Sequence, residues 1–298
     1  MAGSRQPVPP RFAGVYDRYA RALAEAGQLD AASTGRAYTS RIRSYLAWLD
    51  QAGRDGPDPL ADHAGRDGAV RDYLACLTTV RGLAATTVNA HLSALDHFYE
   101  HLGLGAARME RGELPPREPR TLSPAEQARF LAAAGARERA RDRAIARLLL
   151  DAGLSAAELA ALDVGDLPLS DGEGRVIVRD GTGGISREIP LRDPAGRTVL
   201  AEWITRRATW PGAAGPALFL SRLGRRMSDR AVVHLVDGLA AAAGLAGEDG
   251  QAGVSVQTLR YTFGANRLRD GSDIVTVAVL MGYRRLDVVY LLSRSVAT

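Results

Sequence analysis

The chain has 298 residues, about twice the usual length of one domain, so its length predicts two domains joined by a linker. Hydrophobic residues make up 46% of the sequence and charged residues 24%, which can build a core and excludes a disordered or collagen-like chain. The single cysteine, Cys76, excludes a disulfide scaffold and a cysteine-based metal cluster. Residues 1–10 lack the apolar segment of a signal peptide, and the longest uncharged apolar stretch, residues 274–282, is too short to cross a bilayer. We therefore expect a soluble cytoplasmic protein that has no contact with a membrane.

The net charge is only +4, but all 38 basic residues are arginine and none is lysine. A GC-rich genome would produce the same excess of arginine, so this bias alone assigns no function. Its chemical consequence holds in either case, because arginine is a fixed charge whose fork of donors fits phosphate and which gives up no proton near neutral pH. A basic chain of this kind is compatible with an acidic partner such as nucleic acid.

The first ordered block is predicted to be all-helical. Residues 1–11 carry proline and polar residues without periodicity, which is typical of a flexible tail. Helices are predicted over residues 12–26 and 69–79, and two further helices are indicated by apolar faces at helical spacing. These faces are Tyr38, Ile42, Tyr45, Leu46 and Leu49, and Val88, Leu92, Leu95, Phe98 and Leu102. Residues 12–103 are therefore interpreted as one helical bundle.

A second domain is predicted after a linker. From residue 104 to 121 the periodicity stops and prolines cluster, which is typical of an interdomain linker. Residues 122–298 then open with Ser123, a proline and Glu126, a strong helix start. A helix is predicted over residues 138–151, ending at Gly153, and residues 175–179 and 186–191 alternate as strands of a hairpin. Helices resume near residue 194, so the fold class is mainly α-helical with a small antiparallel β-sheet.

Seven short segments stand in a set order along nearly the whole chain. They are residues 85–99 (ATTVNAHLSALDHFY), 122–126 (LSPAE), 153–159 (GLSAAEL), 187–191 (REIPL), 218–221 (LFLS), 257–261 (QTLRY) and 280–283 (LMGY). In order and spacing they resemble the tyrosine recombinase (phage integrase) family. The resemblance implies an N-terminal helical core-binding (SAM-like) domain that binds DNA, followed by a C-terminal catalytic-type α+β domain.

In that family two arginines, two histidine-type residues and a lysine surround the scissile phosphate, and a tyrosine attacks it to form a 3′-phosphotyrosyl link to DNA. Preorganised cations stabilise the charge that spreads over the phosphate oxygens, and a proton donor serves the leaving oxygen. Carried over by position, the first arginine is replaced by Ser155 and the hairpin lysine by Thr182. Ser155 and Glu158 also make a capping box, which explains this position as a helix N-cap.

The histidine positions of the family are substituted as well. The His-x-x-Arg segment reads Gln257 for the first histidine and keeps Arg260, while Tyr261 stands for the second histidine and Tyr283 for the later histidine or tryptophan. The five histidines of the chain, at 63, 91, 97, 101 and 234, all lie upstream of this region, so imidazole acid–base chemistry is lost.

The nucleophile is displaced too. In the family the nucleophile comes nine residues after the later histidine, and Leu292 stands at that distance from Tyr283. Tyr290 comes two residues earlier, which is about 200° around a helix. A rearranged short helix would restore Tyr290 as the nucleophile; otherwise it is a packing or partner-contact tyrosine. Losing one preorganised charge donor costs about 3–4 kcal/mol of barrier, and losing a general acid costs about 10²–10⁴ in rate. We therefore predict a protein without ordinary strand cleavage, with an active integrase that uses Tyr290 as the alternative.

Binding to double-stranded DNA needs only donors and charge on the right surface. The segment that touches DNA in the family corresponds here to residues 221–230, a predicted turn and helix start with Ser228 as the expected N-cap. The alternative interpretation of this segment is a solvated basic turn. The candidate DNA contacts are Arg36, Arg41, Arg43, Thr86, Thr87, Asn89, Arg222, Arg225, Arg226, Arg230 and Arg260. By contrast, the arginines at 137, 139, 141, 143 and 147 alternate with acids and are interpreted as a solvated helix with local ion pairs.

Arg260 has two open interpretations, a remaining phosphate ligand or a buried arginine paired with a carboxylate such as Glu158. No metal or cofactor is expected. The resemblance also implies self-association, or pairing with an intact recombinase, through the segment from residue 285 to 298. The expected protein is a nucleoid-associated accessory, architectural or regulatory factor in recombination or transcription, and an adaptor that contacts only proteins is a third alternative.

Overall fold

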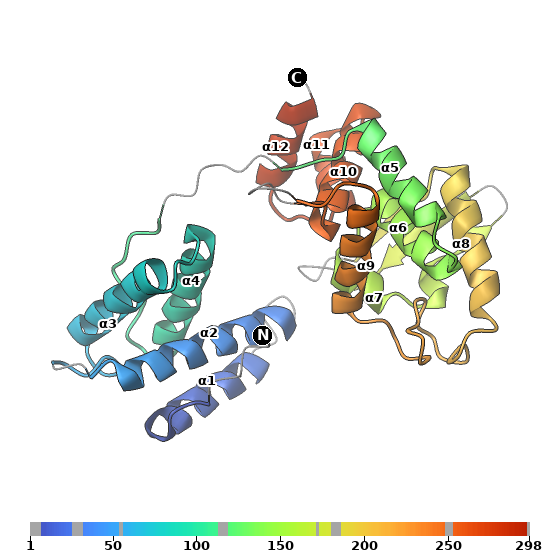
Figure 1. Ribbon diagram of the computed structural model, residues 1–298. Helices are drawn as coiled ribbons and strands as arrows, with labels where there is room; N and C mark the ends of the chain where they lie inside the picture. The colour runs from blue at the N-terminus through green and yellow to red at the C-terminus, as the bar shows by residue number, and fades with distance from the viewer. Residues whose placement is uncertain are drawn as a thin grey trace. The chain divides into compact units, whose positions relative to one another are not determined.

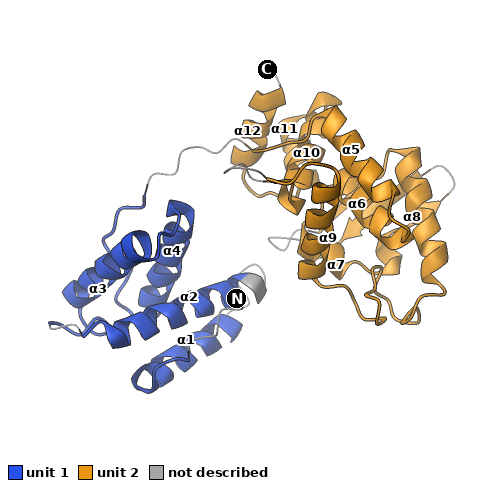
Figure 2. Cartoon of the chain, in the orientation of Figure 1, with its two compact units in different colours: residues 1–117 blue, residues 118–298 orange. Residues whose placement is uncertain are grey.

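The computed structural model describes residues 7–25, 32–53, 56–112, 119–170, 173–179, 186–247 and 253–296. The chain divides into two units, residues 1–117 and 118–298, each with a hydrophobic core of its own (Figure 2). Thr182, the first six residues of the expected tail and residues 113–118 of the expected linker lie outside the described residues. Among those residues, no helix is long and apolar enough to cross a membrane.

Unit 1 is helical wherever the structure describes regular elements in it (Figure 1). Its elements are the 3₁₀ turn η1 (Pro10–Phe12), α1 (Ala13–Glu25), α2 (Ala32–Gln51), α3 (His63–Ala75), the π-helical turn η2 (Cys76–Val80) and α4 (Ala85–His101). The prediction of the third helix was wrong at its start, because the Asp62 carboxylate accepts a hydrogen bond from the amide of Gly65 and caps the helix six residues earlier. The apolar faces of α2 and α4 pack together, with Tyr45 and Tyr99 buried and hydrogen-bonded to each other.

Unit 2 consists of helices and one small β-sheet. Its elements are α5 (Pro124–Gly135), α6 (Ala140–Ala152), α7 (Ala156–Ala161), η3 (Val164–Asp166), β1 (Leu169–Ser170), β2 (Glu173–Val178), β3 (Arg187–Pro190), α8 (Pro194–Arg207), α9 (Asp229–Ala242), α10 (Val256–Arg269), α11 (Ile274–Leu280) and α12 (Asp287–Val296). The three strands are antiparallel in the order β1-β2-β3, and Val176 pairs with Ile189. The mainly helical fold with a small antiparallel sheet is confirmed, and β1, which is only two residues long, was missed.

Helix α6 is the centre of unit 2 and contacts α5, α8 and α10 (Figure 1). It ends at Gly153, whose φ of 59° is left-handed and favours glycine. A Cβ at this position would collide with the ring of Phe263 on α10, so the absence of a side chain also permits close packing. The predicted capping boxes of Ser123 before α5 and of Ser155 before α7 are both confirmed, and Ser228 caps α9 as expected.

The run of arginines on α6 is less solvated than the sequence predicts. Arg141 is only 7% exposed, and its guanidinium donates to the Asp142 carboxylate at 2.7 and 2.8 Å and to the Leu220 carbonyl at 2.9 Å. The interpretation of Arg141 as a solvated residue was therefore wrong, because Arg141 is buried and donates a hydrogen bond to the Leu220 carbonyl in the loop before α9. Arg143 and Arg147 do make ion pairs, with Glu202 and with Asp151.

Candidate functional site

The positions that carry the family resemblance meet where α6 ends and where α7, α10 and α11 approach it. Arg260 of α10 is 2% exposed. Its Nη1 donates to the Gly153 carbonyl at 3.0 Å and to Oε2 of Glu158 at 2.7 Å, and its Nη2 donates to the Met281 carbonyl. The buried ion pair with Glu158, one of the two interpretations of Arg260, is therefore present.

Glu158 lies between two guanidinium groups. Its Oε1 accepts from Nη1 of Arg187 on β3 at 2.9 Å, while its Oε2 accepts from Arg260 and from the amide of Ser155. Burial by itself raises the pKa of Glu158, but the hydrogen bond of Arg187 and the charges of both arginines outweigh burial and hold the pKa well below its ordinary value. The carboxylate is therefore ionised and neutralises charge inside the site.

Three polar side chains lie on the solvent side of Arg260. Nε2 of Gln257 donates to Oη of Tyr283 at 3.1 Å, and the guanidinium carbon of Arg260 is 5.1 Å from the centre of the Tyr283 ring. Burial, together with the neighbouring Tyr283, raises the pKa of the Tyr261 hydroxyl above its ordinary 10.0 despite a hydrogen bond from Gln257. The side chains at the positions that the sequence analysis assigns to the family's histidines are thus an amide and two phenols.

The two candidate nucleophile positions lie on opposite faces of α12. Leu292 is fully buried and packs against α10, where its Cδ1 would be 3.1 Å from a Cβ built at Gly264. Tyr290 is 56% exposed. The structure therefore brings Ser155, Gln257, Arg260, Tyr261 and Tyr283 together, and it leaves the Tyr290 residue more than half exposed.

Arg187 is a member of this site that the sequence reasoning missed. It occupies an inward position of β3, whose residues alternate buried and exposed, and its Nε also donates to the Leu280 carbonyl at 2.8 Å. A charged residue on the buried face of a strand was the available signal, because such a charge requires a partner. Its close approach also explains Gly282 (φ 66°), where a Cβ would be 2.8 Å from Nη1 of Arg187.

The candidate DNA contacts of unit 1 lie on α2 and α4, which pack together. Arg36, Thr86 and Thr87 are exposed, whereas Arg41, Arg43 and Asn89 are half-buried. Two of the half-buried side chains are held within the unit. Nη2 of Arg43 donates to the Tyr16 hydroxyl at 2.7 Å, and Nδ2 of Asn89 donates to the Gly112 carbonyl at 2.9 Å.

The candidate DNA contacts of unit 2 divide into two kinds. Arg222, Arg225 and Arg230 are exposed on the turn and on the first turn of α9. Arg226 instead donates to the last carbonyls of α7, those of residues 160–162, and pairs with Asp163. This arginine therefore neutralises the C-terminus of α7 as well as carrying charge at the surface.

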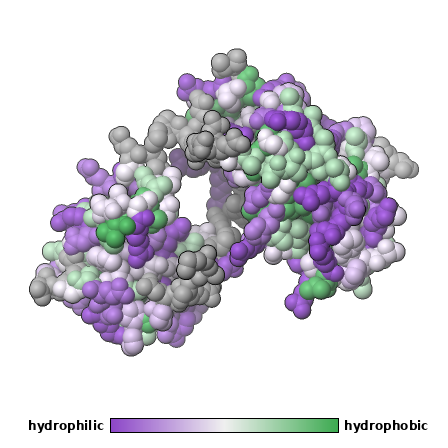
Figure 3. Space-filling view, in the orientation of Figure 1, coloured by the Kyte–Doolittle hydropathy of each residue, from purple (hydrophilic) through white to green (hydrophobic). Residues whose placement is uncertain are grey.

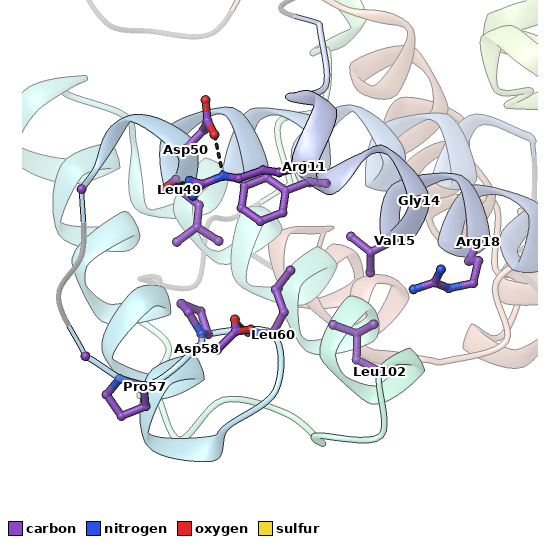
Figure 4. A pocket seen from close by; sticks show the side chains of 14 residues that line it. Arg11, Gly14, Val15, Arg18, Leu49, Asp50, Pro57, Asp58, Leu60 and Leu102 are labelled. Atoms are coloured by element: carbon purple, nitrogen blue, oxygen red, sulfur yellow. Dashed lines mark hydrogen bonds and ion pairs between the residues drawn. The ribbon is translucent and has the colours of Figure 1, made fainter.

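A wide hollow of about 910 Å³ in unit 1 is lined by Arg11, Arg18, Asp50 and Asp58 among apolar residues and glycines (Figure 4). Of its two arginines, Arg11 pairs with Asp50 at 2.6 Å and donates to the Leu49 carbonyl, so the charge of Arg11 is already neutralised. In the parts of the chain that the structure describes, no cluster of histidine, cysteine or carboxylate side chains could hold a metal ion.

Comparison with known proteins gives matches over both units. Residues 120–291 match the model of the phage integrase family, and residues 16–103 match that of the phage integrase N-terminal SAM-like domain. The chain is 29% identical over 291 residues to the tyrosine recombinase XerC of Vibrio cholerae, which covers 95% of this chain and 88% of that protein.

Solved structures of recombinases have the same fold. A XerH site-specific recombinase bound to its palindromic difH substrate is 14% identical, with a TM-score of 0.71 and coverage of 99% of this chain and 95% of that chain. A lambda integrase dimer bound to a core site is 17% identical, with a TM-score of 0.67 and coverage of 94% of both chains.

Proposed function

This chain belongs to the phage integrase family, and from that premise we propose that it binds double-stranded DNA without cleaving it. It acts as an accessory, architectural or regulatory factor in recombination or transcription, associated with the nucleoid in the cytoplasm. The two domains that we propose to contact DNA are residues 12–103 and 122–298, with residues 104–121 as the linker between them and residues 1–11 as a tail.

The burial of Arg260 is the observation that supports the loss of cleavage most strongly. A cation that stabilises the phosphate in transit has to point donors at its oxygens. The Arg260 guanidinium instead donates to Gly153, Glu158 and Met281 and is 2% exposed. The sequence holds no lysine, and the side chains at the positions assigned to the family's histidines are Gln257, Tyr261 and Tyr283, so no imidazole is present there. The second cation of the site, Arg187, donates to Glu158 and to the Leu280 carbonyl.

DNA binding is supported by charge at the surface rather than by the pocket. Arg222, Arg225 and Arg230 are exposed, and so is Arg36 on α2 of unit 1. Exposed guanidinium groups bind phosphate without any catalytic geometry. The XerH recombinase that shares this fold is bound to its palindromic difH substrate, and the lambda integrase dimer is bound to a core site.

The test of DNA binding is the affinity for a 30-base-pair duplex measured by fluorescence anisotropy from low to high salt. The proposal predicts that the logarithm of affinity falls linearly with the logarithm of salt, with a slope that reports several phosphate contacts. The variant Arg222→Ala with Arg225→Ala lowers both affinity and slope. An affinity that is absent, or that does not change with salt, would reject DNA binding and favour the protein-only adaptor.

A second candidate is an active integrase that uses Tyr290, and the exposure of this side chain favours it. A duplex with a nick beside the cleavage position traps a covalent intermediate because the cut strand diffuses away. Since no nucleophile stands at the family position, we expect no protein–DNA adduct. An adduct that is abolished by Tyr290→Phe and kept by Tyr283→Phe would establish the second candidate.

Self-association through the C-terminal segment is the third part of the proposal, with an intact recombinase as the alternative partner. Large apolar side chains are exposed at 45–59% along α11 and at the start of α12: Val275, Val279, Leu286 and Tyr290. Because α11 and α12 contact each other, exposed apolar side chains on both favour an interaction site here. Sedimentation of the wild type and of Val279→Glu with Leu286→Glu, with and without DNA, tests it; identical mass distributions would reject it.

A further inference from the structure

A cavity of about 400 Å³ lies at the start of α6, next to α9 and the loop that precedes it. Arginine side chains converge on it from two separate parts of the chain, Arg137 and Arg139 before α6 and Arg222 before α9. All three are exposed, and no ion pair or hydrogen bond joins their guanidinium groups to the described residues. Like charges that converge without a partner in the protein point to an anion as the missing partner.

The acids near this cavity do not neutralise the three arginines. Asp142 is the acid in its lining, and Arg141 already binds it at 2.7 Å. Asp229 accepts from the backbone amide of Arg230 at the start of α9, while Glu138 and Asp237 are exposed outside the lining. Nε2 of His234, which is also in the lining, accepts a hydrogen bond from Nε of Arg230 at 3.4 Å. The cavity therefore keeps an excess of positive charge.

The cavity is also held in shape. Arg143 donates to the carbonyls of Arg137 and Glu138, which fixes the short connection between α5 and α6. Arg137 lies against α9, where its Nη2 is 3.4 Å from a Cβ built at Gly238. The floor is apolar and consists of Met227, Ala231 and Leu235, as would suit a sugar ring between two phosphates. A fixed backbone beneath Arg137 lowers the entropic cost of holding an anion compared with arginines on a mobile loop.

We propose that Arg137, Arg139 and Arg222 form a binding site for the backbone phosphates of duplex DNA, so that the contact surface of unit 2 extends from the turn before α9 to the start of α6. The inference rests on the proposed DNA binding and adds a region that the sequence pattern assigns to a solvated helix. Phosphate contacts of this kind give affinity and position without reading the base sequence.

The test compares two variants that each lose two positive charges from exposed side chains of unit 2. Arg137→Ala with Arg139→Ala removes the cavity wall, and Arg129→Ala with Arg206→Ala removes charges from α5 and α8 outside the cavity. Affinity for the 30-base-pair duplex is measured across salt concentrations. Loss of two phosphate contacts lowers the magnitude of the salt slope by about 2 in the cavity variant, and the control keeps the wild-type slope.

The outcomes separate this inference from the proposal on which it rests. Wild-type protein without salt-dependent affinity would overturn both, whereas wild-type binding with equal slopes in the two variants would overturn the cavity alone. Thermal unfolding of both variants at the wild-type midpoint shows that each is folded. A cavity made for a free phosphate compound would give stabilisation by inorganic phosphate in the wild type, none in the cavity variant, and an unchanged DNA slope, which also contradicts the inference.

Discussion

Glu158 decides the chemistry of the site at the scale of single residues. One carboxylate serves two buried arginines, so its removal leaves both guanidinium groups without a counter-charge. Removing one partner of a buried pair costs about 3–5 kcal/mol. We expect Glu158→Gln to lower the free energy of unfolding of unit 2 by that amount in urea titrations.

The matched control is Glu188→Gln on the same strand as Arg187. Glu188 pairs with Arg175 at 3.1 Å, but both side chains are more than half exposed, and such pairs contribute about 0–1 kcal/mol. Equal destabilisation by the two substitutions would contradict the role given to Glu158.

The acid stability of unit 2 follows from the same carboxylate. Because the pKa of Glu158 is lowered in the folded protein from its ordinary 4.5, ionisation of this group stabilises the fold above about pH 4.5. That stabilisation is lost as the pH falls further and the carboxylate takes up a proton. We expect the stability difference between wild type and Glu158→Gln to shrink below pH 4.5 in unfolding titrations; a difference that grows toward acid pH would contradict it.

His91 gives unit 1 a different acid response. Burial, with the charges of Arg41 and Arg81, lowers its pKa from 6.5 to about 4. The folded state therefore disfavours the proton that the unfolded state binds, and stability falls as the pH drops from about 6.5 to 4. His91→Gln is expected to remove this slope in thermal unfolding scans of the full chain, while His63→Gln at an exposed position leaves it unchanged.

At the scale of elements, the end of α6 places the site. Gly153 has a positive φ, and a Cβ there would collide with Phe263, so an alanine adds backbone strain of about 1–2 kcal/mol and overpacking of about 1–3 kcal/mol. We expect Gly153→Ala to destabilise unit 2 strongly. Gly135→Ala at the last residue of α5 has open space and no positive φ, and it is expected to leave stability unchanged or raise it. Similar losses in both variants would contradict the argument.

Elements with local signals could be predicted from the sequence. The capping boxes of Ser123 and Ser155 and the glycine at the end of α6 are encoded within a few residues, so these boundaries were found. The two-residue strand β1 and the burial of Arg141 were not, because both depend on contacts with distant segments; the Leu220 carbonyl that Arg141 binds is 79 residues away.

The same limit applies to the site. The assignment of Ser155, Gln257 and Tyr283 to family positions rests on motif order and spacing, and it stays a prediction. The partners of Arg260 could not be identified in this way, because its acceptors Gly153, Glu158 and Met281 are 107, 102 and 21 positions away in the sequence. The sequence therefore leaves two interpretations of Arg260 open. The ion pair with Glu158 forms only when α6, α7, α10 and α11 pack together.

At the scale of the whole molecule, two units with separate cores (Figure 2) carry exposed arginines, and Arg260 of unit 2 is buried. On the face that Figure 3 shows, hydrophilic side chains cover much of the surface of both units and hydrophobic side chains are scattered among them. The exposed arginines carry the proposed binding of DNA, and the buried ion pair of Arg260 with Glu158 stabilises unit 2 from within.

Incubation of negatively supercoiled plasmid with purified protein, at a salt concentration where binding is complete, tests this account most directly. Bound plasmid that keeps its linking number after the protein is removed is the predicted result, because binding without strand cleavage cannot relax DNA. Relaxed topoisomers formed by the wild type and absent with Tyr290→Phe would contradict the account.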